Sequence, residues 1–233
     1  YYVSMVDDVR KNGCEPVLTL PFLLTTSFVP QPNVGTPDYT IAVANSVELA
    51  KKILHLVNTV HKRNVKYVII GNEPDKDYDW EVGATCGSCP GGTLSAVHVA
   101  SNIAGYFKPI AEAVREIDPS IKIIGVEFTE CLPKVYNELF DPGTSSPSYI
   151  GGVIPNTSQP YLDYASVHFY GPTYTATPSW EPGPATWNHF RAFANIEKYS
   201  KEKWDSPTST RRYRGAMSAS ARAAPVPTPF SIP

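Results

Sequence analysis

Short apolar runs alternate with amphipathic stretches along most of this chain, and this alternation is the feature that most restricts its fold. The runs that we expect to be strands cover residues 17–20, 67–70, 121–124 and 164–167. Short, mostly apolar runs are typical of parallel strands that are covered by helices. The sequence therefore predicts an α/β fold in which these four strands are neighbours in one parallel sheet with helices outside it.

Helical patterns fill the intervals between these runs. Residues 1–11 have apolar positions on one face, which predicts a helix there. A long loop is expected over residues 21–44. Asn45 with Glu48 three positions later predicts the start of a helix that continues to about residue 63. Another helix is expected at residues 103–117, where Asp118 and Pro119 end it. Further helices are expected at 133–139 and at 186–204.

Polar residues follow two of the predicted strands where each strand ends. Gly71, Asn72, Glu73 and Pro74 come directly after residues 67–70. Because α/β folds place their chemistry at the carboxyl ends of parallel strands, a carboxylate here suits catalysis. Glycoside cleavage requires such a group to protonate the leaving oxygen, whereas the simplest alternative is an ordinary solvated turn.

His168 and Tyr170 follow the last predicted strand in the same way, although each residue taken alone is more often a packed core side chain. The Asn-Glu-Pro motif and this later His-x-Tyr together resemble the clan A glycoside hydrolases, which are retaining (β/α)8-barrel enzymes. The resemblance implies a TIM barrel in which strands three to six are recognisable and the rest is not, so the barrel looks incomplete. It covers residues 1–205, without resolving the individual family.

The resemblance also implies roles for particular residues. Glu73 would be the acid/base for retaining cleavage of O-glycosidic bonds in a poly- or oligosaccharide. Asn72 would bind the sugar 2-hydroxyl, and His168 and Tyr170 would line the cleft. Trp180 is a candidate for stacking on a sugar ring, or else for simple packing. No cofactor or metal is implied, and no single sugar.

The nucleophile that the resemblance requires, a Glu ending strand seven, has no counterpart in the sequence. Residues 206–233 form a basic, Ser/Ala/Pro-rich tail without any Asp or Glu. Glu127 is the best substitute as a second carboxylate, with a surface role as its alternative. We therefore expect the chain as it stands to hydrolyse glycosides poorly or not at all. The rival hypotheses are a non-catalytic carbohydrate-binding remnant of the barrel and an unrelated barrel enzyme that uses a Glu.

Composition bears on the partners. A formal net charge of −2, with Lys and Arg spread along the chain, gives no large basic field, so nucleic acid is not expected as a partner. No apolar stretch reaches the length of about 18 residues that a membrane-spanning helix needs. The expected partner is a carbohydrate, and the oligomeric state does not follow from the sequence.

The cysteines and one short motif concern the cellular compartment. Cys86 and Cys89 suit a local disulfide behind Glu73, with free thiols as the alternative, because a redox or zinc site lacks the necessary context. Asn156, Thr157 and Ser158 form an N-glycosylation sequon in an expected loop, a pattern that also arises by chance. An extracellular protein is the expectation that fits both features, and the resemblance implies that it degrades polysaccharides.

Overall fold

The computed structural model describes residues 1–22, 32–75, 80, 82–87, 89–128, 133–141, 143 and 145–167. The helix expected at 186–204 and the tail 206–233 lie outside the described residues. In chain order the described elements are α1 (Tyr2–Lys11), β1 (Val17–Leu20), α2 (Pro37–Leu54), η1 (His55–Val60), β2 (Tyr67–Ile70), η2 (Pro90–Gly92), α3 (Ala96–Ile117), β3 (Lys122–Phe128), α4 (Pro133–Phe140) and β4 (Tyr164–Val167).

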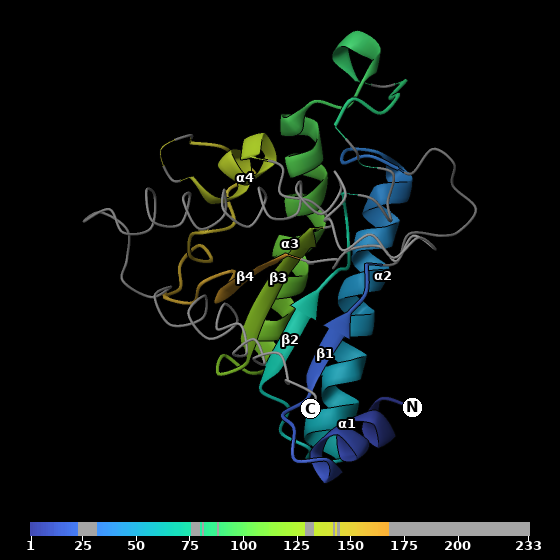
Figure 1. Cartoon of the computed structure of the whole chain (residues 1–233), viewed down its shortest axis with the longest axis vertical. Helices are drawn as coiled ribbons and strands as arrows, with labels where there is room; N and C mark the ends of the chain where they lie inside the picture. Colours follow the sequence, from blue (N-terminus) through green and yellow to red (C-terminus); the bar gives the residue numbers. More distant parts are fainter. Residues whose placement is uncertain are drawn as a thin grey trace, which may run out of the picture.

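The four strands form one parallel sheet in the order β1-β2-β3-β4, as the sequence predicts (Figure 1). Val17 pairs with Tyr67, and Tyr67 with Lys122, so the first three strands begin at the same level. Consecutive parallel strands need a crossover between them, and α2 and α3 provide the first two. The α/β architecture of alternating strands and helices is therefore confirmed.

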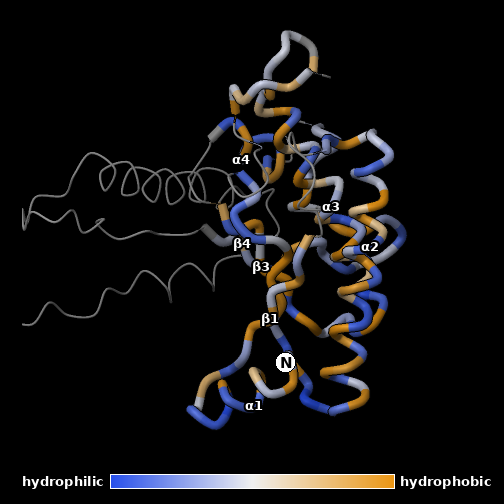
Figure 2. The backbone as a smooth tube through the Cα atoms, turned by 90° about the vertical axis from the view of Figure 1, so that its right-hand side faces the viewer, coloured by the Kyte–Doolittle hydropathy of each residue, from blue (hydrophilic) through white to orange (hydrophobic). Residues whose placement is uncertain are grey.

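The helices α2 and α3 pack against each other and cover one face of the sheet (Figures 1 and 2). Alternate residues of β1 and β2 are the buried ones, namely Leu18 and Leu20 in β1 and Val68 and Ile70 in β2. The α3 helix has an amphipathic sequence whose apolar stripe enters this core. Its largest fully buried side chains are Ile103, Tyr106, Phe107 and Ile110.

Several predicted boundaries are wrong, including the start of α3, which begins at Ala96 and not at residue 103. The α2 helix begins at Pro37, inside the loop expected over residues 21–44, and its N-cap is Thr36 instead of Asn45. The Thr36 hydroxyl accepts a hydrogen bond from Tyr39 N at 3.3 Å, and proline at the first helical position is already preorganised for a helix. The β3 strand also runs to Phe128, four residues beyond its expected end at residue 124.

A buried ion pair connects α3 to the two strands beyond it. Arg115, near the end of α3, donates to the carboxylate of Asp163, which immediately precedes β4, and to the carbonyl of Ile121. Asp163 also accepts from Ile123 N at 2.9 Å and from Lys122 Nζ at 3.0 Å. These contacts fix the amino ends of β3 and β4, at the opposite end of the sheet from Glu73.

Candidate active site

Glu73 lies just beyond the carboxyl end of β2, which ends at Ile70. The residue is only 8% exposed, and its backbone has a positive φ of 38°. Its amide N–H donates to the carbonyl oxygen of Glu127 at 3.1 Å. A bond of this kind extends the β2–β3 pairing past the last strand residue, so it holds the Glu73 backbone against the neighbouring strand.

Glu127 occupies an irregular position near the end of β3. Val126 pairs with Ser166 and Phe128 pairs with Val167, so Glu127 is an extra residue that forms a β-bulge. Its φ of 52° is also positive, as at Glu73. Bulges and positive φ values outside glycine are concentrated next to functional sites, where they redirect side chains. Glu73 and Glu127 are thus joined by a backbone hydrogen bond at the carboxyl ends of the two central strands.

Gly71 allows the chain to turn from β2 toward Glu73. Its φ is +80°, and a Cβ atom at this position would stand 2.6 Å from the hydroxyl oxygen of Tyr106 on α3. Both the left-handed backbone and the close approach of the ring therefore require glycine. This contact explains why a glycine precedes Asn72 and Glu73 in the motif.

Four aromatic side chains form a cluster that meets the turn at Gly71 through Tyr106. They are Phe22, Tyr39, Trp80 and Tyr106. Phe22 and Tyr106 stack with their ring centroids 4.4 Å apart. Trp80 also stacks on Tyr106, with ring centroids 6.0 Å apart. All four are almost fully buried. They come from the loop after β1, α2, the loop after β2 and α3, so the cluster joins the two strand-end loops to both helices.

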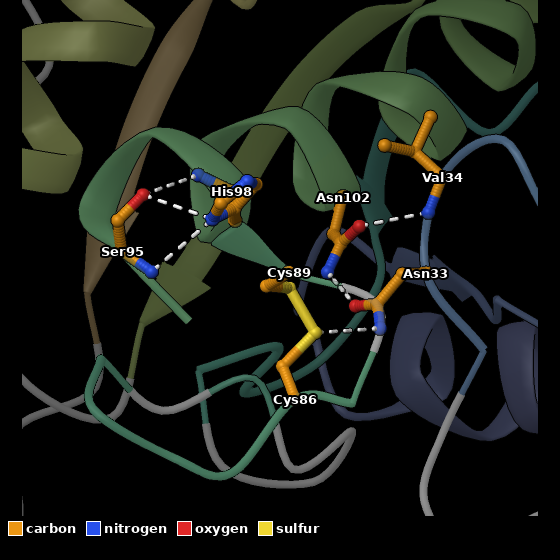
Figure 3. The surroundings of a disulfide bond; sticks show 7 residues. All are labelled: Asn33, Val34, Cys86, Cys89, Ser95, His98 and Asn102. Carbon is orange, nitrogen blue, oxygen red and sulfur yellow. Dashed lines mark hydrogen bonds between the residues drawn. A yellow bond between two sulfur atoms is a disulfide. The ribbon is translucent and has the colours of Figure 1, made fainter. Parts of the chain in front are cut away.

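The predicted local disulfide between Cys86 and Cys89 is present in the structure (Figure 3). Asn33 donates to the Cys86 sulfur at 3.5 Å and accepts from Asn102 on α3 at 2.7 Å. Asn102 in turn accepts from Val34 N at 2.9 Å. This network attaches the disulfide loop to α3 and to the segment that precedes α2. Of the other two cysteines, Cys14 is a free, exposed thiol and Cys131 lies outside the described residues.

The remaining residues of the predicted site are placed as follows. Asn72 is exposed beside Glu73. His168, Tyr170 and Trp180 lie outside the described residues, so their roles in the cleft stay predictions. Asp75, two positions after Glu73, is only 4% exposed and has no role predicted from the sequence. Only its proximity to Glu73 in the sequence could have indicated this buried carboxylate.

A groove of about 570 Å³ lies elsewhere, between α2, α3 and the loop before β4. Its lining includes Val47, Pro109, Ile154 and Pro155. Lys51 and Glu116 form an ion pair across it at 3.1 Å. The groove is formed on the outward sides of the helices and contains none of the strand-end residues.

The described residues also bear on metal ions and membranes. Within those ranges, no group of three or more His, Cys, Asp and Glu side chains is arranged to hold a metal ion. The helices of the described segments also include none with both the length and the apolar character to cross a bilayer.

Comparison with known proteins supports the fold. No protein-family model matches the sequence, and no curated protein does. Among solved structures, a bacterial orthologue of human α-L-iduronidase matches with a TM-score of 0.51 and 14% identity over 84% of this chain and 28% of that one. At this identity the match concerns the fold alone: four parallel strands alternating with helices correspond to part of a TIM-barrel glycosidase.

Two other glycosidase structures match less well. PbGH5A, a glycoside hydrolase family 5 enzyme from Prevotella bryantii B14, has a TM-score of 0.48 and 13% identity over 84% of this chain and 50% of that one. AbfB, a family 51 α-L-arabinofuranosidase from Bifidobacterium longum, has a TM-score of 0.44 and 14% identity over 90% of this chain and 36% of that one. The chain thus spans no more than half the length of any of the three proteins.

Proposed function

We propose that this chain carries the acid/base part of a retaining glycoside hydrolase site, with Glu73 as the group that protonates the leaving oxygen. The observation that supports this most is the position of Glu73, a largely buried carboxylate beyond the carboxyl end of a parallel strand. Its backbone is bonded to the bulge of the adjacent strand. Chemistry in barrel enzymes is located at this end of the sheet.

The proposed reaction begins with proton transfer from the Glu73 carboxyl to the glycosidic oxygen as the bond to the anomeric carbon breaks. Exposed Asn72, beside Glu73, would donate to the sugar 2-hydroxyl, an interaction that strengthens in the transition state. We propose that His168, Tyr170 and Trp180 line the same cleft. A second carboxylate would form an ester bond with the anomeric carbon, and the Glu73 carboxylate would then deprotonate the water that displaces this carboxylate.

A retaining mechanism also needs a second carboxylate about 5 to 5.5 Å from the first. We propose Glu127 as a member of the cleft, supported by the bond between its carbonyl and Glu73 N. Whether it attacks the sugar can be determined by labelling. A fluorosugar inactivator that forms a covalent adduct on Glu127, located by peptide mass spectrometry, would identify it as the nucleophile.

The principal experiment uses an external nucleophile, so that it does not depend on finding the internal one. The purified chain is incubated with aryl glycosides and azide, which takes the place of a missing carboxylate and yields a glycosyl azide of inverted configuration. Glu73→Gln should lower the rate for phenyl glycosides by about 10²- to 10⁴-fold, because these leaving groups require protonation. It should affect dinitrophenyl glycosides little, since they depart without a proton.

Glu116→Gln is the matched control, because Glu116 is an exposed carboxylate on the outer face of α3. This variant should retain the parent rate on both substrates. Equal losses on phenyl and dinitrophenyl glycosides after Glu73→Gln would contradict the assignment of Glu73 as the acid.

The second candidate function is carbohydrate binding without cleavage. It is favoured by one observation, the absence of any Asp or Glu from residues 206–233, where the nucleophile would be expected. Calorimetric titration with oligosaccharides would then give binding, while the azide assay would give no product with any leaving group.

A further inference from the structure

We propose that Asn156 is an N-glycosylation site that carries an asparagine-linked oligosaccharide. Asn156, Thr157 and Ser158 form the acceptor sequence Asn-x-Ser/Thr. No other asparagine of the chain has Ser or Thr two positions later. The inference is independent of the proposed glycosidase function, because it concerns a different part of the molecule.

The acceptor residue lies at the tip of a tight turn in the segment before β4. Ile154 N donates to Gln159 O at 2.8 Å, and Val153 forms an antiparallel bridge with Pro160. Asn156 itself adopts a φ of 62°, which Asn tolerates better than most residues. Residues 155–158 are all exposed, so a transferase can reach the Asn156 side chain.

The turn is held by the middle residue of the sequon. The Thr157 hydroxyl donates to Ile154 O at 2.9 Å and accepts from Gln159 N at 3.1 Å. These local hydrogen bonds are made by Thr157 and not by the side chain of Asn156 or Ser158. A glycan on Asn156 therefore requires no rearrangement of the turn.

The position of the turn suits a glycan for a second reason. Ile154 and Pro155 lie beside the second half of α3, near Pro109 and Glu116. This part of α3 leads to the amino ends of the strands. Glu73 lies at the opposite end of the sheet, beyond the carboxyl end of β2. An oligosaccharide on Asn156 would stand clear of the Glu73 region and would cover Val153, which is 56% exposed, and the apolar rim of the groove.

A separate observation indicates the compartment in which such transfer occurs. Disulfides persist in secreted proteins and in the lumen of the endoplasmic reticulum, and Cys86 and Cys89 form one. Glycosyl transfer to Asn takes place in the same oxidising compartment. The disulfide and the exposed sequon thus agree, although they are far apart in the sequence.

The donor would be an oligosaccharide linked to a polyprenyl pyrophosphate. The Asn156 amide nitrogen attacks the anomeric carbon of the first sugar, forming a C–N bond. The bond from that carbon to the phosphate oxygen breaks, the lipid pyrophosphate leaves, and one amide proton passes to a base on the transferase. No oxidant or reductant is required.

The test is secretion of the full chain from yeast behind a cleavable leader, followed by intact-mass and peptide mass spectrometry. We expect a hexose ladder on the peptide that contains Asn156, removed by peptide N-glycosidase with conversion of that side chain to a carboxylate. Asn156→Gln and Ser158→Ala should each abolish the ladder. Asn64→Gln is the matched control, since Asn64 is also exposed, with a φ of 48°, but Lys66 occupies the second position after it.

An intact disulfide and an unchanged circular dichroism spectrum establish that each secreted variant is folded. An unmodified Asn156 in the folded parent protein would overturn the proposal, as would a ladder that persists in Ser158→Ala.

Discussion

At the scale of single residues, the backbone around Glu73 is fixed by contacts that no carboxylate motif alone specifies. Gly71 turns the chain with a φ of +80°, and its Cα faces the Tyr106 ring. Glu73 and Glu127 both adopt positive φ values and are joined through Glu73 N. Such conformations cost free energy, so they persist only because the surrounding packing imposes them.

Gly71→Ala should therefore destabilise the fold. The new methyl group would meet the buried Tyr106 ring, and alanine disfavours this φ, so we expect a loss of about 2–4 kcal/mol in the free energy of unfolding. Urea denaturation followed by tryptophan fluorescence measures this loss. Gly87→Ala is the control, because a Cβ atom there meets nothing within 4 Å. Equal stability of the two variants would show that the Tyr106 contact does not restrict Gly71.

At the scale of elements, the buried pair of Arg115 and Asp163 connects α3 to β3 and β4. Burial alone would raise the pKa of the Asp163 carboxyl, but hydrogen bonds from Ile123 N, Arg115 and Lys122 outweigh it and lower that pKa below its ordinary value of 3.8. A carboxyl with a lowered folded-state pKa stabilises the fold above the unfolded-state pKa. That contribution is lost as the pH falls through the folded-state pKa.

Asp163→Asn should lower the free energy of unfolding at pH 7 by about 3 kcal/mol, because Arg115 would remain buried without its carboxylate. The difference between variant and parent should shrink below pH ~3.8, where Asp163 is protonated in the unfolded parent. Urea denaturation over a series of pH values measures both effects. Asp7→Asn is the control at the exposed Arg63 pair and should change little; a loss at pH 7 as large as that of Asp163→Asn would contradict the account.

The sequence predicts those elements whose apolar pattern is local, and it misses features that arise from pairing between strands. Periodicity located β1, β2 and β4 correctly, because each apolar run coincides with the segment that pairs in the sheet. It ended β3 too early, since Gly125 interrupts the apolar run and the bulge at Glu127 arises from pairing with β4. The start of α2 was missed although Thr36 and Pro37 mark it.

The candidate site was predictable in its position along the chain but not in its surroundings. Asn72 and Glu73 could be identified because a motif follows a strand. The bond from Glu73 to Glu127 and the stacking of Phe22, Trp80 and Tyr106 join segments far apart in sequence, and no local pattern encodes which of them meet.

At the scale of the whole molecule, four parallel strands form a sheet that corresponds to part of a barrel. A complete active site of the retaining type draws carboxylates from two strands and closes a cleft around the sugar. Glu73 and Glu127 are contributed by adjacent strands here, while residues 206–233 contribute no Asp or Glu.

We therefore predict that the chain hydrolyses aryl glycosides in water very slowly, and that azide accelerates turnover. General acid catalysis by Glu73 supplies about 10²- to 10⁴-fold, whereas the remainder requires a nucleophile that an external anion can replace. The measurement is release of the aryl alcohol with and without azide, together with the configuration of the product. Rapid hydrolysis with retention in the absence of azide would contradict this prediction and would require a nucleophile within the chain, which fluorosugar labelling would then locate.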